Sequence, residues 1–253
     1  VGRIADRIAS RTALYGVLEI LIGLCALAIP AAIRAIEPWM AALYRADPNG
    51  WALPVARFAL ATAIMLAPTI LMGATLPLLI RHFTEGRETV GQKTGLLYGI
   101  NTVGAMFGAL AAGFYLIPAL GMRATNWIAA SINFAVGVLA IGLALAMRKS
   151  AASANAAAEA RPAADEEHVA LPAGAGAVLI GIAIAGAAAM IYQVCWTRLF
   201  ALLIGSSTYS FSIVVSITIG GLALGGVMLG RWVDRVRSPI LFFATLQLLI
   251  ALA

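Results

Sequence analysis

Charged side chains are scarce in this sequence. Only 11% of its 253 residues are Asp, Glu, Lys or Arg, whereas 62% are hydrophobic. Soluble domains average about 25% charged and roughly 45–50% apolar residues, so this composition excludes an ordinary soluble domain. It predicts a polytopic membrane protein of the all-α class, a helical bundle whose main partner is the lipid bilayer.

Residues suited to catalysis and metal binding are also few. His82 and His168 lie in separate polar segments, no Cys-x-x-Cys occurs, and no Gly-x-Gly-x-x-Gly follows a strand. Cys25 and Cys195 lie in different apolar runs, where we expect small buried hydrophobic residues rather than a disulfide or a metal site. We predict no catalytic site, no metal site and no cofactor in this chain.

The sequence instead contains long apolar runs. A bilayer core of about 30 Å takes about 20 helical residues to cross, and six runs are long enough. A seventh, of fifteen residues at the C-terminal end, is interpreted as a truncated span. The seven runs are residues 12–33, 55–80, 96–120, 126–147, 177–204, 208–229 and 239–253.

The segments between the runs give further predictions. Residues 34–54 are more polar and contain Asp47-Pro48-Asn49-Gly50, which predicts an external loop that could include a short helix at the membrane interface. Pro68 and Pro77 predict a kink or a break in the second span. A tight turn is expected at Gly121, between the third and fourth spans.

The two ends of the chain resemble each other. Residues 1–25 and 229–253 align without gaps at nine identical positions, and both contain Gly-x-x-x-Asp-Arg. A repeat of 228 residues implies two similar halves. We predict a first-half bundle at 1–147 and a second-half bundle at 177–253, joined by a polar, Ala- and Ser-rich linker at 148–176.

Positive charges predict the orientation of the loops. Twelve of the 17 Lys and Arg residues lie on one side when the spans alternate, and the positive-inside rule makes that side cytoplasmic. The cytoplasmic segments are then 1–11, 81–95, 148–176 and 230–238. The arginines are spread between apolar runs rather than clustered, so the net charge of +6 does not indicate nucleic-acid binding. We expect a multi-pass protein of the cell membrane, the inner membrane of a bacterium.

The repeated loop motif has two interpretations. Its carboxylates could meet a helix N-terminus or pair with an arginine, forming a gating latch between two helix bundles. Alternatively, the motif is a static turn with orientation charges. The residues concerned are Gly2, Asp6 and Arg7 in the first copy and Gly230, Asp234 and Arg235 in the second.

Glu19 is the one carboxylate well inside an apolar run. Charges within a membrane span are costly and usually face a cavity or a partner, so Glu19 is a candidate for binding a proton or a small cationic solute. The alternative is a structural hydrogen bond to a neighbouring helix. Its repeat counterpart, Gln247, cannot titrate, which favours that alternative.

Three further polar residues are candidates for substrate or ion binding. Tyr192 and Gln193 could line a site near the middle or the outer half of the membrane. The nearby Trp196 and Arg198 are interpreted as interfacial residues. Asn101 could contact a ligand, although a hydrogen bond between helices explains it more simply.

Several of these stretches together resemble a known family. The Gly-x-x-x-Asp-Arg motif is similar to the loop signature of the major facilitator superfamily, whose members have two six-helix halves joined by a cytoplasmic linker. The stretches Met72-Gly73-Ala74-Thr75-Leu76-Pro77 and Tyr192-Gln193-Val194-Cys195-Trp196-Thr197, with residues 97–105, 117–121 and 205–209, resemble the membrane region of fused transporter-like/spermidine-synthase proteins.

The resemblance implies an expected function. Residues 1–147 would be spans three to six, and residues 177–253 would be spans seven to nine. A soluble spermidine-synthase-like (aminopropyltransferase) domain, with polyamine-related chemistry, would follow downstream. We predict that the chain anchors such a domain and could move a small solute by alternating access. A secondary transporter with no enzyme attached and a membrane scaffold that transports nothing remain open as alternatives.

Overall fold

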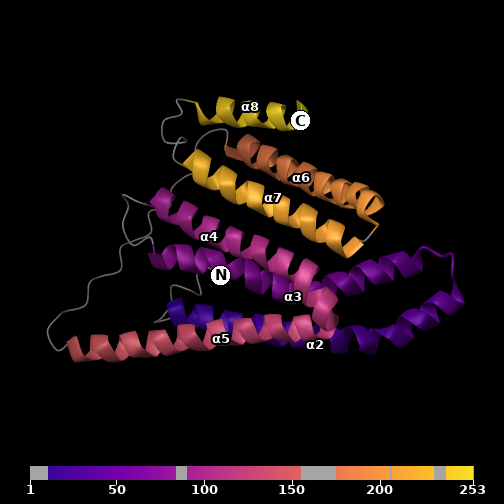
Figure 1. The fold of residues 1–253 in the computed structure, drawn as a ribbon, viewed down its shortest axis with the longest axis horizontal. Helices are drawn as coiled ribbons and strands as arrows, with labels where there is room; N and C mark the ends of the chain where they lie inside the picture. The colour runs from indigo at the N-terminus through magenta and orange to yellow at the C-terminus, as the bar shows by residue number, and fades with distance from the viewer. Residues whose placement is uncertain (1–10, 84–89, 155–174, 206, 231–237, 253) are drawn as a thin grey trace. The chain divides into compact units, whose positions relative to one another are not determined.

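The computed structural model describes residues 11–83, 90–154, 175–205, 207–230 and 238–252. Within these ranges every regular element is a helix and there is no strand, so the predicted all-α class is confirmed. The elements are α2 (Arg11–Ala46), α3 (Ala52–Phe83), α4 (Val90–Ala111), the π-helical turn η2 (Ala112–Leu116), α5 (Ile117–Ala154), α6 (Ala175–Ile204), α7 (Ser207–Gly230) and α8 (Pro239–Leu252) (Figure 1).

Five helical stretches are long and apolar enough to cross a membrane, and α8 adds a shorter apolar helix, Leu241–Leu252. The longest stretch, Thr94–Met147, has 54 residues and would extend about 80 Å as one helix, far more than a bilayer core of about 30 Å. It is interrupted at Gly121, whose φ of 80° and ψ of 166° suit only glycine. The predicted turn at Gly121 is therefore confirmed, and each side of it is long enough for a crossing.

Large apolar side chains cover the outside of these helices. On α6, Leu202 and Leu203 are 83% and 81% exposed, and Phe58 on α3 is 76% exposed. Such side chains are normally buried in soluble proteins, whereas a helix that is apolar all round is typical of a membrane span. The helices therefore indicate a multi-pass membrane protein.

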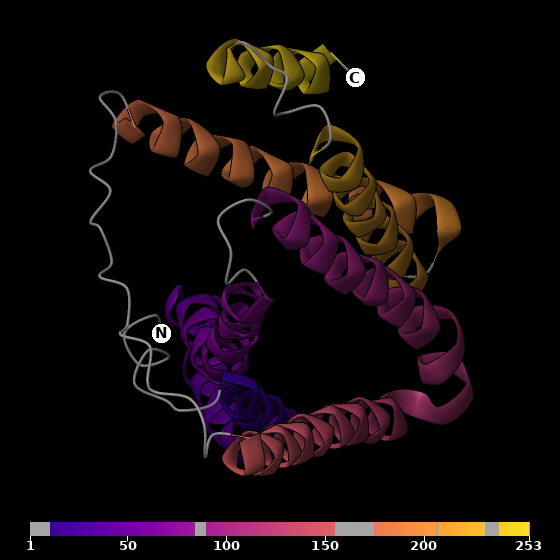
Figure 2. The same ribbon diagram turned by 90° about the vertical axis from the view of Figure 1, so that its left-hand side faces the viewer.

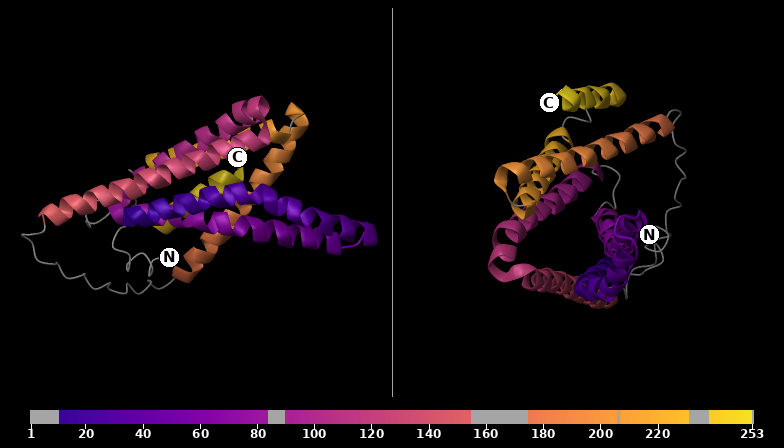
Figure 3. Two further views of the ribbon diagram at one scale, coloured as in Figure 1. Left: turned by 90° about the horizontal axis from the view of Figure 1, so that it is seen from below. Right: turned by 90° about the vertical axis from the view of Figure 1, so that its right-hand side faces the viewer.

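The first of two compact units comprises residues 1–88 and 120–158, and so contains α2, α3 and most of α5. α2 and α3 lie side by side (Figure 3). α2 also packs against α5, where a Cβ atom added to Gly16 would lie 2.5 Å from the carbonyl oxygen of Gly137. In the reverse direction, a Cβ atom on Gly137 would lie 2.7 Å from the carbonyl oxygen of Gly16. The two backbones therefore touch with no room for a side chain, as small residues allow between membrane helices.

The second unit comprises residues 89–119 and 159–253, with α4, η2, α6, α7 and α8. α7 packs against both α4 and α6 and lies between them (Figure 1, Figure 2). Its face toward α4 carries small hydroxyl residues: Ser216 Oγ donates to the carbonyl oxygen of Met106 at 3.4 Å, and the Ser212 side chain lies against Gly113 of η2. Small polar residues of this kind let membrane helices pack closely and hydrogen-bond to one another.

The external loop predicted for residues 34–54 is wrong over most of its length. α2 continues to Ala46, and only residues 47–51 separate it from α3. Residues 34–46 include many good helix formers, such as Ala, Met, Leu, Arg and Glu. Polar residues can end the membrane-spanning part of a helix without ending the helix itself.

The second span has no break at its prolines, because α3 runs as one helix through Pro68 and Pro77. Nearby hydroxyl groups contribute hydrogen bonds: Thr69 Oγ1 donates to the carbonyl oxygen of Met65 at 2.8 Å, and Thr75 Oγ1 donates to that of Met72 at 2.7 Å. Neighbouring Ser and Thr side chains are one reason that membrane helices tolerate proline.

The predicted linker at 148–176 is helical at its edges, since α5 ends at Ala154 and α6 begins at Ala175. Residues 155–174 lie outside the described part of the chain. The two predicted sequence halves, their facilitator-like relation and the cytoplasmic side of the loops stay predictions.

Candidate functional site

A pocket of about 330 Å³ lies in the second unit, where α6, α7 and α8 contribute to its wall. Its polar and aromatic lining residues are Tyr192, Gln193, Trp196, Thr218 and Gln247. The remainder of the lining is small or apolar: Ala185, Ala188, Ala189, Ile250 and Ala251. We call this site the mid-span pocket.

The helical period explains how α6 forms one wall of this pocket. Ala185, the adjacent pair Ala188 and Ala189, Tyr192 and Trp196 recur about once per helical turn, which places them on one face of the helix. The alanines leave space in the wall, and the larger side chains border it.

Each polar group of the pocket lies near the middle of an apolar stretch of its own helix. Gln193 lies at the middle of the apolar stretch Ile180–Ile204, and Thr218 lies at the middle of Thr208–Met228. Gln247 lies at the middle of the shorter apolar helix Leu241–Leu252. If α6 and α7 cross the bilayer, Gln193 and Thr218 lie near its centre, where water is scarcest, and the pocket places Gln247 of the shorter α8 beside them.

The aromatic side of the pocket is a stacked pair. The rings of Tyr192 and Trp196, one helical turn apart, have centroids 5.6 Å apart and planes 18° from parallel. They are 40% and 47% exposed, so each ring keeps a free surface. We expected Trp196 to be an interfacial residue, but it lines the same pocket as Tyr192 and Gln193.

The two glutamine amides on the pocket wall lack hydrogen-bond partners. Gln193 and Gln247 are both half-buried, and within the described ranges neither side chain makes a hydrogen bond. The backbone carbonyl of Gln193 accepts a bond from Thr197 Oγ1 at 2.7 Å, and Thr218 Oγ1 donates to the carbonyl of Val214 at 2.7 Å. Each amide therefore still offers donors and an acceptor to another molecule.

A second pocket, of about 310 Å³, shares Gln193 with the first. It is lined by α6 and by Phe211 of α7, and it contains Arg198 and Thr197. Arg198 is its one charged lining residue, and the mid-span pocket has no ionisable carboxylate, ammonium or guanidinium group in its described lining. Gln193 thus lies between an uncharged pocket and a pocket with one positive charge.

Glu19 lies in the first unit, on α2. Its half-buried carboxylate accepts a hydrogen bond from the hydroxyl of Tyr15, one helical turn earlier. The bond is within one helix, so the alternative of a hydrogen bond to a neighbouring helix is not found among the described residues. The predicted proton or cation site at Glu19 stays a prediction. The bond between helices comes from Asn126 instead, whose Nδ2 donates to the carbonyl oxygen of Ala26 at 2.8 Å.

The other candidates lie apart from the mid-span pocket. Asn101 is exposed on α4, and its side chain has no hydrogen-bond partner among the residues that the structure describes. Gly230 is the last residue of α7. The remaining loop-motif residues, Gly2, Asp6, Arg7, Asp234 and Arg235, lie outside the described residues.

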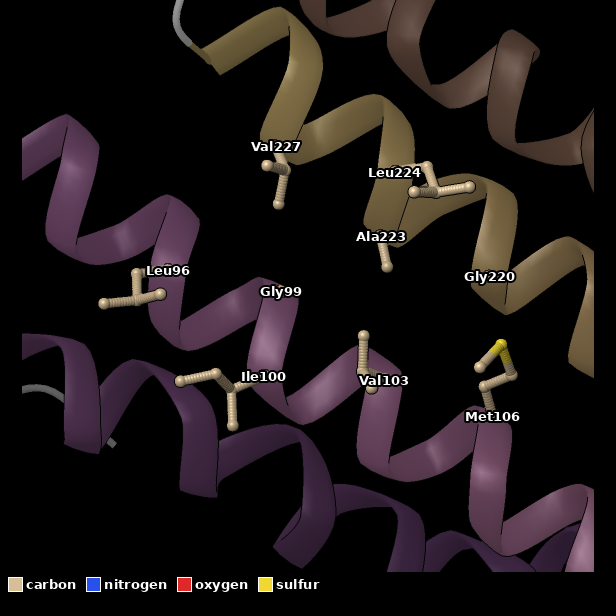
Figure 4. A pocket seen from close by; sticks show the side chains of 9 residues that line it. All are labelled: Leu96, Gly99, Ile100, Val103, Met106, Gly220, Ala223, Leu224 and Val227. Atoms are coloured by element: carbon tan, nitrogen blue, oxygen red, sulfur yellow. The ribbon is translucent and has the colours of Figure 1, made fainter.

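A groove of about 460 Å³ between α4 and α7 is larger but entirely apolar in its lining (Figure 4). Leu96, Ile100 and Val103 of α4 border one side, and Ala223 and Leu224 of α7 border the other (Figure 4). Ligand sites generally combine apolar walls with a few placed polar groups. The mid-span pocket has such groups and this groove has none, so the mid-span pocket is the candidate functional site.

The cysteines and possible metal ligands add nothing to the site. Both cysteines are free, and Cys195 is exposed rather than buried as expected. The described ranges hold no cluster of three or more His, Cys, Asp or Glu residues.

Two pocket residues were not predicted from the sequence. Gln247 had a usable signal, since it is the repeat counterpart of Glu19 and the one amide in its apolar run. Thr218 had none, because a threonine in a membrane helix is commonplace. The chain matches no family model, no curated protein and no solved structure. Its family resemblance therefore stays a prediction.

Proposed function

We propose that this chain is the membrane-embedded part of a secondary transporter and that the mid-span pocket binds its solute. One observation is the main support for this proposal. A single pocket is lined by Gln193, Thr218 and Gln247, which come from three helices and lie near the middle of their apolar stretches. Polar residues inside the membrane commonly mark substrate pathways, and transporter sites lie near the bilayer midplane. Aromatic walls and few polar groups are also typical of small-molecule sites.

The unpartnered amides favour transport over a passive scaffold. Both side chains are half-buried, and among the described residues no fully buried side-chain nitrogen or oxygen lacks a hydrogen-bond partner. Facing hydrocarbon, however, a polar group without a hydrogen bond is costly. Leucine would pack better at both positions, so packing does not explain the two amides. A solute or water that enters the pocket would satisfy them.

The sequence repeat supports alternating access between two halves. Glu19 and Gln247 occupy equivalent repeat positions, and Gln247 lines the mid-span pocket. We infer that Glu19 marks the equivalent position in the first unit, with a carboxylate in place of the amide. A small cationic solute remains the prediction that follows from Glu19 and the family resemblance.

A second proposal is that the chain anchors a spermidine-synthase-like domain. Its support is the stretch Tyr192-Gln193-Val194-Cys195-Trp196-Thr197, which carries part of the family resemblance and also lines the pocket. The sequence downstream of Ala253 tests this proposal. A reading frame that ends shortly after a twelfth span would contradict it and leave the transport proposal intact.

Glu19→Gln is expected to abolish the stimulation of solute uptake by a pH gradient, because glutamine keeps the bond to Tyr15 but cannot exchange a proton. The measurement is uptake into proteoliposomes of labelled putrescine, glucose, glycine and uracil, with and without an acidic exterior. Glu37→Gln is the matched control, since Glu37 is an exposed carboxylate on the same helix. Equal pH stimulation in wild type and Glu19→Gln would remove Glu19 from the mechanism.

A further inference from the structure

We propose that the mid-span pocket recognises an uncharged, planar heterocycle with adjacent hydrogen-bond donors and acceptors, a ligand of the nucleobase class. This inference rests on the proposed function and specifies its substrate. It differs from the small cation that Glu19 and the family resemblance predict. The argument uses only the groups on the pocket wall.

The charge of the pocket excludes an ion. Its described lining residues carry no formal charge. The adjoining pocket shares Gln193 and contains Arg198, which comes two residues after Trp196 and so lies on another face of α6. An ion taken from water into the middle of a membrane span needs an opposite charge or several strong hydrogen bonds. A cation would find no carboxylate among the lining residues of the mid-span pocket. An uncharged solute has no such requirement.

The amides determine the hydrogen-bonding pattern. Gln193 on α6 and Gln247 on α8 each present one acceptor and two donors, and both are unpartnered within the described part of the chain. A glutamine pairs best with a group that donates and accepts at neighbouring positions, as the edge of a nucleobase does. A hydrocarbon would leave both amides unsatisfied.

The aromatic pair determines the shape. Tyr192 and Trp196 are stacked nearly parallel, and both remain partly exposed toward the pocket. Flat rings stack on such side chains, with a contribution of about 1–3 kcal/mol per nucleobase. The rest of the lining includes four alanines and Thr218, whose small side chains leave room for a thin ligand. The volume of about 330 Å³ suits a small molecule rather than a peptide.

The test is equilibrium binding of labelled uracil and adenine to the whole chain in lipid nanodiscs. Competition by glucose, putrescine and benzoate distinguishes a non-planar neutral solute, a cation and a planar anion. We expect uracil or adenine to bind, and the three competitors to be ineffective. Gln247→Ala should weaken nucleobase binding about tenfold, which corresponds to the loss of one or two hydrogen bonds at a buried site.

Three more variants keep the test independent of folding. Trp196→Ala should weaken nucleobase binding, and Trp196→Phe should restore most of it, because a flat ring returns. Thr245→Ala is the control on α8, since Thr245 is exposed and bonds only to the carbonyl of Leu241 on its own helix. Its binding should equal that of wild type.

Several results would overturn the inference. They are tighter binding of putrescine, glucose or benzoate, nucleobase binding that Gln247→Ala and Trp196→Ala leave unchanged, and no nucleobase binding at millimolar concentration. Uptake of another labelled solute that depends on this pocket would end the nucleobase assignment but keep the transport proposal. Failure of every solute to enter proteoliposomes would contradict the transport proposal itself.

Discussion

Replacing Gly16 by leucine is expected to lower the free energy of unfolding by about 3 kcal/mol or more, the upper range for overpacking a tight contact. A Cβ atom at Gly16 would lie 2.5 Å from the carbonyl oxygen of Gly137 and 2.7 Å from Cγ1 of Ile141. The leucine can be accommodated only if α2 and α5 move apart. That movement would also strain the bond from Asn126 Nδ2 to the carbonyl of Ala26.

The measurement is the unfolding midpoint of Gly16→Leu in mixed micelles titrated with dodecyl sulfate, followed by circular dichroism. Val17→Leu is the control, because Val17 is the next residue and is 44% exposed. Gly16→Ala should lie between the two, since it adds one methyl group to the same contact. Equal midpoints for Gly16→Leu and Val17→Leu would show that α2 and α5 do not touch at this position.

Replacing Ala188 by phenylalanine is expected to block the mid-span pocket without removing any of its polar groups. Ala188 lines the pocket, so a ring at this position would occupy the space that a solute needs. A steric conflict of about 1–3 kcal/mol corresponds to a loss of roughly 5- to 150-fold in affinity. Uptake into proteoliposomes at low solute concentration should fall by a similar factor.

The neighbouring residue provides the control for this prediction. Ala187 is exposed and does not line the pocket, so Ala187→Phe adds the same ring to the same helix on a different face. Its uptake should remain close to that of wild type. Equal loss in both variants would indicate damage to α6 rather than a blocked site. Unchanged uptake in Ala188→Phe would remove the pocket from the transport pathway.

The sequence predicted the helices better than their ends. Apolar runs identified the spans, because the cost of exposing backbone polar groups to lipid forces a long apolar segment to be helical. The end of α2 was missed by thirteen residues, at Ala46 rather than at residue 33. Hydropathy changes at Arg34, where the span leaves the apolar region, but helix propensity continues. Hydropathy reports whether a segment suits lipid, and helix propensity reports whether its backbone suits a helix, so the two can change at different residues.

The site was only partly predictable for a related reason. Tyr192 and Gln193 were recognisable as polar residues within an apolar run. Their relation to Thr218 and Gln247 depends on how three helices pack, which the sequence of no single helix contains. Glu19 was the strongest single signal in the sequence, yet its carboxylate bonds to Tyr15 on its own helix. A polar residue within a membrane span predicts a hydrogen-bonding or charged partner but does not identify that partner.

The central claim, a polar pocket inside the membrane that water and solutes can reach, is tested most directly by cysteine labelling. Gln193→Cys and Gln247→Cys are made with Cys25 and Cys195 replaced by alanine, and Leu248→Cys serves as the lipid-facing neighbour, since Leu248 is 66% exposed. A small charged methanethiosulfonate reagent reacts with the thiolate, which forms only where water has access. We predict fast labelling at positions 193 and 247 in proteoliposomes and slow labelling at position 248. Labelling at 193 and 247 as slow as at 248 would contradict the account.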